Sequence, residues 1–111
     1  MRAGELDRRV DVQERTVTQG DVGENVESWS TVRTQWMGKR DVRAAERLKG
    51  NGELAAEIDT VFKARYLPGR DIAPDTHRLL YGGRVYQIHG VTELGRGEAI
   101  EITCQARGEA L

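Results

Sequence analysis

Few side chains in this 111-residue sequence are spaced so that they could do chemistry together. His77 and His89 are the only histidines, and neither has a partner at the spacing of a zinc site. The single cysteine, Cys104, lies in an alternating apolar run and is typical of a small buried residue rather than a nucleophile. No carboxylate stands in the apolar context that acid–base catalysis requires. The sequence therefore predicts no catalytic residue, no metal site and no cofactor, and we do not expect the protein to be an enzyme.

One glycine-rich segment formally matches a nucleotide-binding fingerprint. Residues 50–55 read G-x-G-x-x-A, but that fingerprint needs an apolar strand before it and a helix after it. Here a charged helical run precedes the glycines and a strand follows them. We therefore do not expect a dinucleotide site.

The composition limits the class of protein. Only 38% of the residues are hydrophobic and 5% are aromatic, while 32% are charged and the net charge is −1. A core this thin favours subunits that bury surface against each other, although a small soluble domain with a charged exterior is an equal alternative. The neutral total shows no basic excess of the kind that nucleic-acid binders carry. No secretory signal is expected, and no apolar run approaches the roughly 18 residues that span a membrane.

Alternating apolar residues predict the strands that must position any functional side chain. The most distinct signal is the stretch 57–92, in which the apolar residues alternate along 58–66. Gly82-Gly83 links the runs 77–81 and 84–88, as in a two-residue hairpin whose glycines both take positive φ. The runs 9–15, 28–37 and 98–105 add further strands. Their expected inward residues are Val10, Val12, Trp36, Ile100, Ile102 and Cys104, with Trp29 partly exposed.

Two excursions interrupt these strands. Residues 16–27 are rich in turn-forming types and predict a long, exposed and mobile hairpin loop. Residues 38–56 predict a helix-bearing insertion, in which Asp41 caps a short helix over 42–49. We expect an all-β fold with one small helix: a single domain over 1–111, built as a small β-barrel of five to six antiparallel strands.

An alternative function follows from the barrel itself. Small barrels often bind single-stranded nucleic acid through exposed aromatic residues with basic neighbours. The candidates here are Phe62, Tyr66, Tyr81 and Tyr86, although aromatic residues at alternating strand positions are more often part of the core.

The ordered motifs of the chain resemble the head-closure proteins of long-tailed bacteriophages, also described as head–tail joining, stopper or head–tail adaptor proteins. The resemblance extends to related prophage and gene-transfer particles. It departs from the family pattern at Trp36-Met37-Gly38, where a Trp-Ala pair is more typical. The resemblance rests on five motifs: AGELDRRV at residues 3–10, the segment of residues 23–29, Arg65-Tyr66, D-x-x-R-L-x-Y-G-G-R-x-Y-x-I-x-G-V at residues 75–91, and I-E-I-x-C at residues 100–104.

The resemblance implies a structural virion component at the head–tail neck, assembled in the host cytoplasm. Such proteins form a homo-oligomeric ring, a hexamer or a dodecamer, that closes the DNA-filled head and docks the tail. The implied partners are a portal or adaptor connector protein, a tail terminator or tail tube protein, and packaged double-stranded DNA, with no membrane.

The resemblance and the two excursions together suggest three sets of site residues. The loop 16–27 is expected to contact the adjacent ring, and the insertion is expected to line or gate the DNA channel. A third set is placed at contacts between subunits. The ring-contact residues are Gln19, Asp21, Gly23, Glu24 and Asn25; the channel residues are Arg43, Glu46, Arg47 and Lys49; the inter-subunit residues are Arg65, Arg70 and Asp71.

Overall fold

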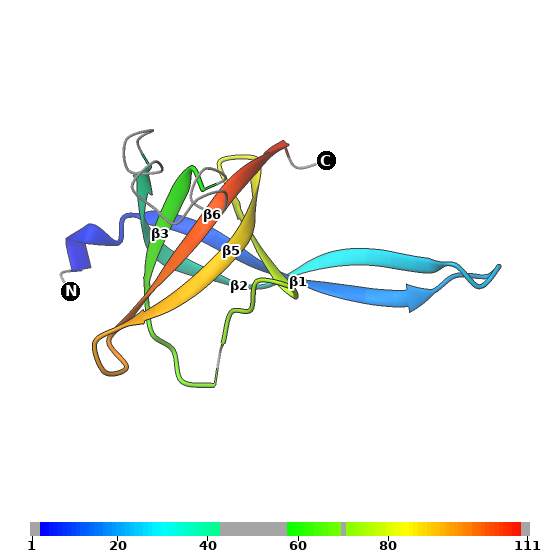
Figure 1. Cartoon of the computed structure of the whole chain (residues 1–111), viewed down its shortest axis with the longest axis horizontal. Helices are drawn as coiled ribbons and strands as arrows, with labels where there is room; N and C mark the ends of the chain where they lie inside the picture. Colours follow the sequence, from blue (N-terminus) through cyan, green and yellow to red (C-terminus); the bar gives the residue numbers. More distant parts are fainter. Residues whose placement is uncertain (1–2, 43–57, 70, 110–111) are drawn as a thin grey trace.

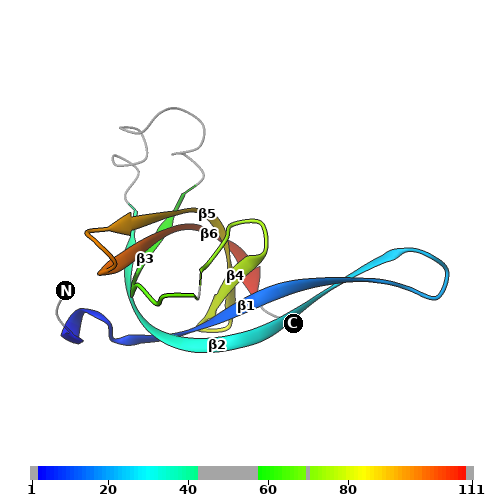
Figure 2. The ribbon, with the colours of Figure 1, turned by 90° about the horizontal axis from the view of Figure 1, so that it is seen from below.

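The computed structural model describes residues 3–42, 58–69 and 71–109. In this part the chain is all-β, as expected, with one short 3-10 helix at its start. Six antiparallel strands close on themselves in the order β1-β2-β3-β6-β5-β4, so that the sheet forms a barrel (Figures 1 and 2). The elements are η1(Ala3–Glu5), β1(Arg8–Gln19), β2(Asn25–Asp41), β3(Thr60–Arg65), β4(His77–Tyr81), β5(Arg84–Leu94) and β6(Ala99–Glu109).

The core fills the inside of the barrel. Phe62 lies at its centre, fully buried, and the rings of Tyr86 and Tyr81 meet it edge to face at centroid distances of 5.1 and 6.3 Å. Every strand contributes at least one inward side chain. The other members of the core are Val10, Val12, Met37, Ala64, Ile72, Leu79, Ile88, Ile102 and Cys104.

The hairpin expected at Gly82-Gly83 is confirmed. It joins β4 to β5, with Tyr81 paired to Arg84 and φ angles of 60° and 77° at the two glycines. Both angles lie in the left-handed region, where a side chain would be strained, so glycine suits both positions.

The expectation of a loop over 16–27 is wrong. Residues 16–19 belong to β1 and residues 25–27 to β2, and their pairing continues without a break as far as Gln19 and Asn25. Only 20–24 form a turn. The turn-forming residue types marked the tip correctly, but Thr16, Val17 and Thr18 are good strand formers that pair readily once β2 lies alongside.

The core position in β2 is Met37, not Trp36 as expected. Met37 pairs with the buried Ala64 and is fully buried, whereas Trp36 is 53% exposed. Trp36 instead lies on the outside of the barrel. The centroid of its ring is 5.8 Å from the guanidinium carbon of Arg9.

This reversal has a physical reason. Directly paired residues of an antiparallel pair share one face of the sheet, so the partners of buried residues face inward. By this rule Arg33, Gln35 and Lys39 face inward, opposite Val12, Val10 and Phe62. Polar side chains at the ends of a barrel can reach water with their tips. The inward face of β2 therefore looks polar in sequence, and its outward face looks apolar.

The second excursion lies mostly outside the described residues. Residues 38–41 are the last part of β2, so the insertion begins later than expected. The predicted helix over 42–49 falls on residues that the structure does not describe, apart from Val42, whose backbone N–H donates to the carbonyl of Asp59 at 2.9 Å.

Gly38 marks a close approach between β2 and the start of the chain. A Cβ atom at this position would lie 2.5 Å from the backbone carbonyl oxygen of Glu5. We expect Gly38→Ala to lower the free energy of unfolding by about 1–3 kcal/mol, because a backbone atom cannot move away as a flexible side chain can. Urea unfolding measures the effect. Gly4→Ala is the matched control, since a Cβ there has no neighbour within 4 Å, and an equal loss in both variants would contradict this account.

Candidate functional site

The first two strands leave the barrel together as a two-stranded ribbon, which we define as residues 15–29. It projects from one side of the barrel and accounts for the elongated shape, 48 Å against 31 and 25 Å (Figures 1 and 2). Its strands pair from Arg15 with Trp29 to Gln19 with Asn25. The ribbon is therefore an arm with regular hydrogen bonding rather than an irregular loop.

The turn at the end of the ribbon is closed by its own hydrogen bonds. The N–H of Gly20 donates to the carbonyl of Glu24 at 2.6 Å, and the N–H of Gly23 donates to the carbonyl of Gly20 at 3.0 Å. The side chain of Gln19 donates to the carbonyl of Gly23 at 3.3 Å. All five residues predicted to contact a partner ring thus lie together at the tip and are exposed: Gln19, Asp21, Gly23, Glu24 and Asn25.

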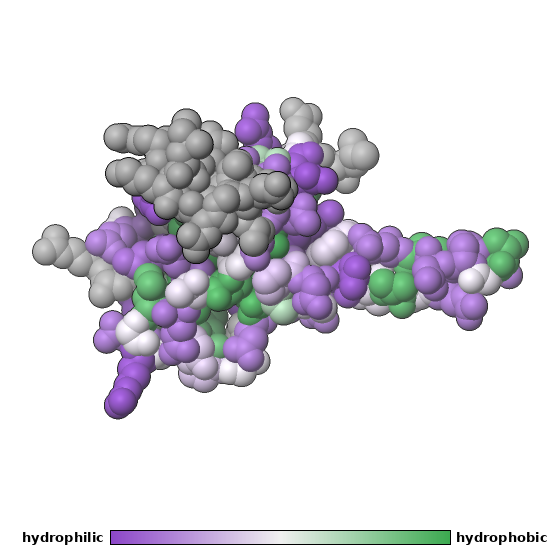
Figure 3. Space-filling model, viewed as in Figure 1, coloured by the Kyte–Doolittle hydropathy of each residue, from purple (hydrophilic) through white to green (hydrophobic). Residues whose placement is uncertain are grey.

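The tip combines acidic charge with exposed apolar surface. The sequence has no basic residue between Arg15 and Arg33, but it has three acidic ones, Asp21, Glu24 and Glu27. Val22 is 88% exposed at the turn, and Val17 and Val26 are about half exposed beside it; Figure 3 shows apolar and polar residues mixed along this arm. Exposed apolar groups with a polar rim are typical of a protein-binding surface.

A cluster at the base fixes the ribbon to the barrel. The guanidinium carbon of Arg78, in β4, lies 4.5 Å from the ring centroid of Trp29, and its Nε donates to Gln13 Oε1 at 2.7 Å. Trp29 Nε1 donates to Glu27 Oε1 at 2.8 Å, and Arg15 lies 3.7 Å from the same carboxylate. Partial burial lowers the pKa of Arg78, partly offset by the charge of Glu27. Trp29 is partly exposed, as predicted, but its contact with Arg78 joins residues 49 positions apart, for which the sequence holds no signal.

Two of the three predicted inter-subunit residues lie around one hollow. Arg65 and Asp71 are exposed and both line a cavity of about 400 Å³. Arg33, Ile72 and Glu93 also line it. The hollow is therefore lined by apolar side chains together with charges of both signs. Arg70 lies outside the described residues.

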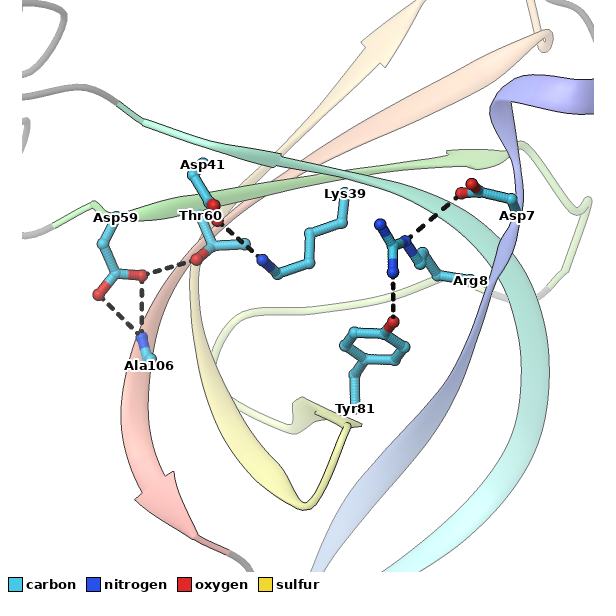
Figure 4. Close-up of polar contacts among 8 residues, drawn as sticks. All are labelled: Asp7, Arg8, Lys39, Asp41, Asp59, Thr60, Tyr81 and Ala106. Atoms are coloured by element: carbon cyan, nitrogen blue, oxygen red, sulfur yellow. Dashed lines mark hydrogen bonds and ion pairs between the residues drawn. The ribbon is translucent and has the colours of Figure 1, made fainter.

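Polar side chains gather at one end of the barrel, and several of them are largely exposed (Figure 4). Arg8 donates to Tyr81 Oη at 3.0 Å, and this hydrogen bond is the main reason that the pKa of Arg8 is raised. Lys39 Nζ lies 2.8 Å from Asp41 Oδ1. Asp59 accepts hydrogen bonds from the backbone N–H of Ala106 and from the Thr60 hydroxyl. The chain leaves β2 toward the insertion at this end. The predicted channel residues Arg43, Glu46, Arg47 and Lys49 lie outside the described residues.

The comparison with protein families identifies the chain. The family model of the phage head completion proteins matches residues 1–107. The chain belongs to this family. It is therefore a structural head–tail component of a phage-type virion, and it assembles with other head and tail proteins.

Two solved structures share the fold of this chain. The solution structure of protein SF1141 from Shigella flexneri 2a has a TM-score of 0.77 at 28% identity, covering 96% of each chain. A chain of the virion of a native gene transfer agent particle has a TM-score of 0.64 at 22% identity, covering 95% of this chain and 96% of the other. The second likeness shows the fold alone. The curated proteins include no match to this chain.

The four aromatic residues considered for base stacking in this head completion protein are all at least partly buried. Phe62 and Tyr86 are buried inside the barrel, and Tyr81 and Tyr66 are half buried. Tyr81 also lies inside the barrel against Phe62 and Arg8. Base stacking needs an exposed ring face. None of these four candidate rings therefore offers the fully exposed face on which the single-stranded nucleic-acid alternative depended.

Cys104 is buried, as predicted. Burial raises the pKa of its thiol, and the nearby carboxylate of Asp59 raises it further. We expect the native protein at pH 8 to react with a thiol reagent at least about a hundredfold more slowly than the unfolded protein, because the reactive thiolate is both scarce and inaccessible. Absorbance at the reagent's chromophore, with and without guanidinium, measures the two rates. Equal rates would contradict this placement.

Both histidines have structural contacts. The backbone N–H of Ala73 donates to His77 Nδ1 at 3.0 Å, while His89 Nε2 lies 3.3 Å from Gln105 Oε1. Within residues 3–42, 58–69 and 71–109 no three potential metal ligands come together. The described part of the chain also contains no helix that could cross a membrane.

Proposed function

We propose that this head completion protein forms a ring at the head–tail connector, where it closes the DNA-filled head and docks the tail. The observation that carries the proposal is the ribbon. The two-stranded arm projects from the closed barrel, and its tip is exposed, acidic and partly apolar. A partner protein that covers the arm would explain why the free arm exposes so much apolar surface.

In this proposal the tip contacts the adjacent ring through Gln19, Asp21, Gly23, Glu24 and Asn25. The partner ring is the portal or adaptor connector on the head side, or the tail terminator or tail tube protein on the tail side. The resemblance to head-closure proteins further suggests that the insertion, with Arg43, Glu46, Arg47 and Lys49, faces packaged DNA in the channel.

The ring itself, a hexamer or a dodecamer, needs two complementary faces on each copy, because neighbours in a closed ring meet through different surfaces. The hollow with Arg65 and Asp71 supplies one such face in this proposal, while Arg70 is assigned to the same contact from the sequence alone. Its rim carries both signs of charge, which suits pairing with a mixed-charge surface of the next copy.

Electron microscopy of particles made with and without the protein tests the function. We expect particles that lack it to be heads that lose their DNA and carry no tails, and we expect a ring of this protein at the neck of complete particles. Tailed, DNA-filled particles in its absence would overturn the proposal.

A further inference from the structure

The outer edge of β2 within the ribbon is an unpaired strand edge. β2 pairs with β3 only over 37–41, and β1 pairs with β4 only over 11–14. In the part of the chain that the structure describes, no strand lies beside the outer edge of β2 from Asn25 to Thr31.

Hydrogen-bond alternation shows which backbone groups face outward on this edge. The N–H of Arg15 donates to the carbonyl of Thr76 at 2.8 Å, so it points away from β2. In an antiparallel pair, two residues directly opposite each other both point inward or both point outward. Trp29, the partner of Arg15, therefore points its N–H and C=O away from β1. The same orientation recurs at every second residue: Asn25, Glu27, Trp29 and Thr31.

This edge lacks the features that keep natural edge strands from pairing. Between Asn25 and Thr31 the sequence is NVESWST, which has one charged residue, no lysine and no proline. The bulge in the pairing lies in β2 directly beyond this segment: Val12 pairs with Arg33 and Gln13 with Thr31, which leaves Val32 as the extra residue. A long, regular edge of this kind recruits another strand unless something covers it. The edge is thus built to be covered when the protein assembles.

We propose that this edge binds an extended, basic segment of a protein in the neighbouring ring as an added β-strand. The inference rests on the proposed function, in which the ribbon reaches that ring, and it specifies how the contact is made. Main-chain hydrogen bonds from the four outward residues supply the affinity. The ribbon beyond Arg15 carries no basic residue but three acidic ones, Asp21, Glu24 and Glu27. Their negative charge favours a basic segment over a neutral or acidic one. The same three acidic residues oppose pairing with the ribbon of another copy, because like charges would come together.

Proline substitutions on the outward positions test the backbone contact. Asn25→Pro with Thr31→Pro removes two outward N–H groups. Asn25→Ala with Thr31→Ala removes the same two side chains but keeps both N–H groups, so the difference between the two variants measures the backbone contact alone. Proline is tolerated in an edge strand where its nitrogen faces solvent, so the free ribbon should persist. We expect the proline variant to join filled heads to tails at least about tenfold less often than the alanine variant, as the loss of two hydrogen bonds near 1 kcal/mol each requires. Normal joining by the proline variant, or equal loss in the alanine variant, would overturn the proposal.

Two further measurements separate a damaged ribbon from a lost contact. NMR of the free variant should retain the cross-strand contact between the Hα atoms of Val17 and Glu27, which are directly paired. The cryo-electron microscopy map of the wild-type neck gives a result that depends on no variant. We expect a third strand about 4.8 Å from β2 that belongs to another protein and bears lysine or arginine near Asp21 and Glu24. An uncovered edge, or a strand from a second copy of this chain, would overturn the proposal.

The charge-reversal pair Asp21→Lys and Glu24→Lys distinguishes this inference from the function on which it rests. If this pair blocks joining while the proline variant joins normally, the ribbon binds through side chains alone; the strand-addition inference then fails and the proposed function stands. If the ribbon touches no protein in the neck, both fail together.

Discussion

Shortening the ribbon should leave the barrel folded and abolish the joining of heads to tails. The change replaces Gln19–Asn25 by Asn-Gly, a two-residue turn that suits the pair Thr18 and Val26 flanking it. The removed segment contains no core residue, so the free energy of unfolding should change by less than about 1 kcal/mol. Joining should fall to the background of particles that lack the protein, because the whole exposed tip is gone.

The measurement combines urea unfolding of the purified variant with counts of tailed particles by electron microscopy. Arg96→Ala is the control, since it alters the exposed turn between β5 and β6 and leaves the ribbon intact. Wild-type numbers of tailed particles with the shortened ribbon would show that the tip has no part in docking. A large loss of stability would instead mean that the ribbon supports the barrel.

Phe62→Ala should destabilise the protein by about 3–5 kcal/mol, whereas Trp36→Ala should cost at most about 1 kcal/mol. Phe62 is fully buried between Tyr81 and Tyr86, and its removal leaves a cavity that the closed sheet cannot collapse to fill. Trp36 is about half exposed, so its removal leaves no enclosed cavity and chiefly costs the contact with Arg9. Against a typical total stability of about 5–15 kcal/mol, the first change threatens folding and the second does not.

Urea unfolding followed by far-ultraviolet circular dichroism measures both variants. An unchanged denaturant slope is needed for the comparison, since a changed slope means that the compactness of one state has altered. Met37→Ala provides an internal check on the orientation of β2 and should cost about 2–5 kcal/mol. If Trp36→Ala proves as costly as Met37→Ala, the inward face of β2 has been assigned wrongly.

Much of the fold could be predicted from local pattern. The alternation along 58–66, the Gly82-Gly83 hairpin and the apolar run ending at Cys104 each depend on residues close in sequence, and each is found where expected. Strand periodicity and turn chemistry are local properties, so the sequence expresses them directly. The motifs that resemble head-closure proteins are also short local segments, so the sequence alone reveals them. The family match over 1–107 supports this resemblance.

The sequence by itself therefore determined the all-β class, the principal turns, the family and the position of the exposed tip. The tertiary structure alone decided three further features. The face of β2 that enters the core depends on its pairing partners, which place Met37 inward and Trp36 outward. The stacking of Arg78 on Trp29 depends on closure of the barrel. The unpaired edge of β2 exists because β3 pairs only with the end of that strand. In each case the deciding contacts join residues far apart in the chain, and local periodicity carries no information about them.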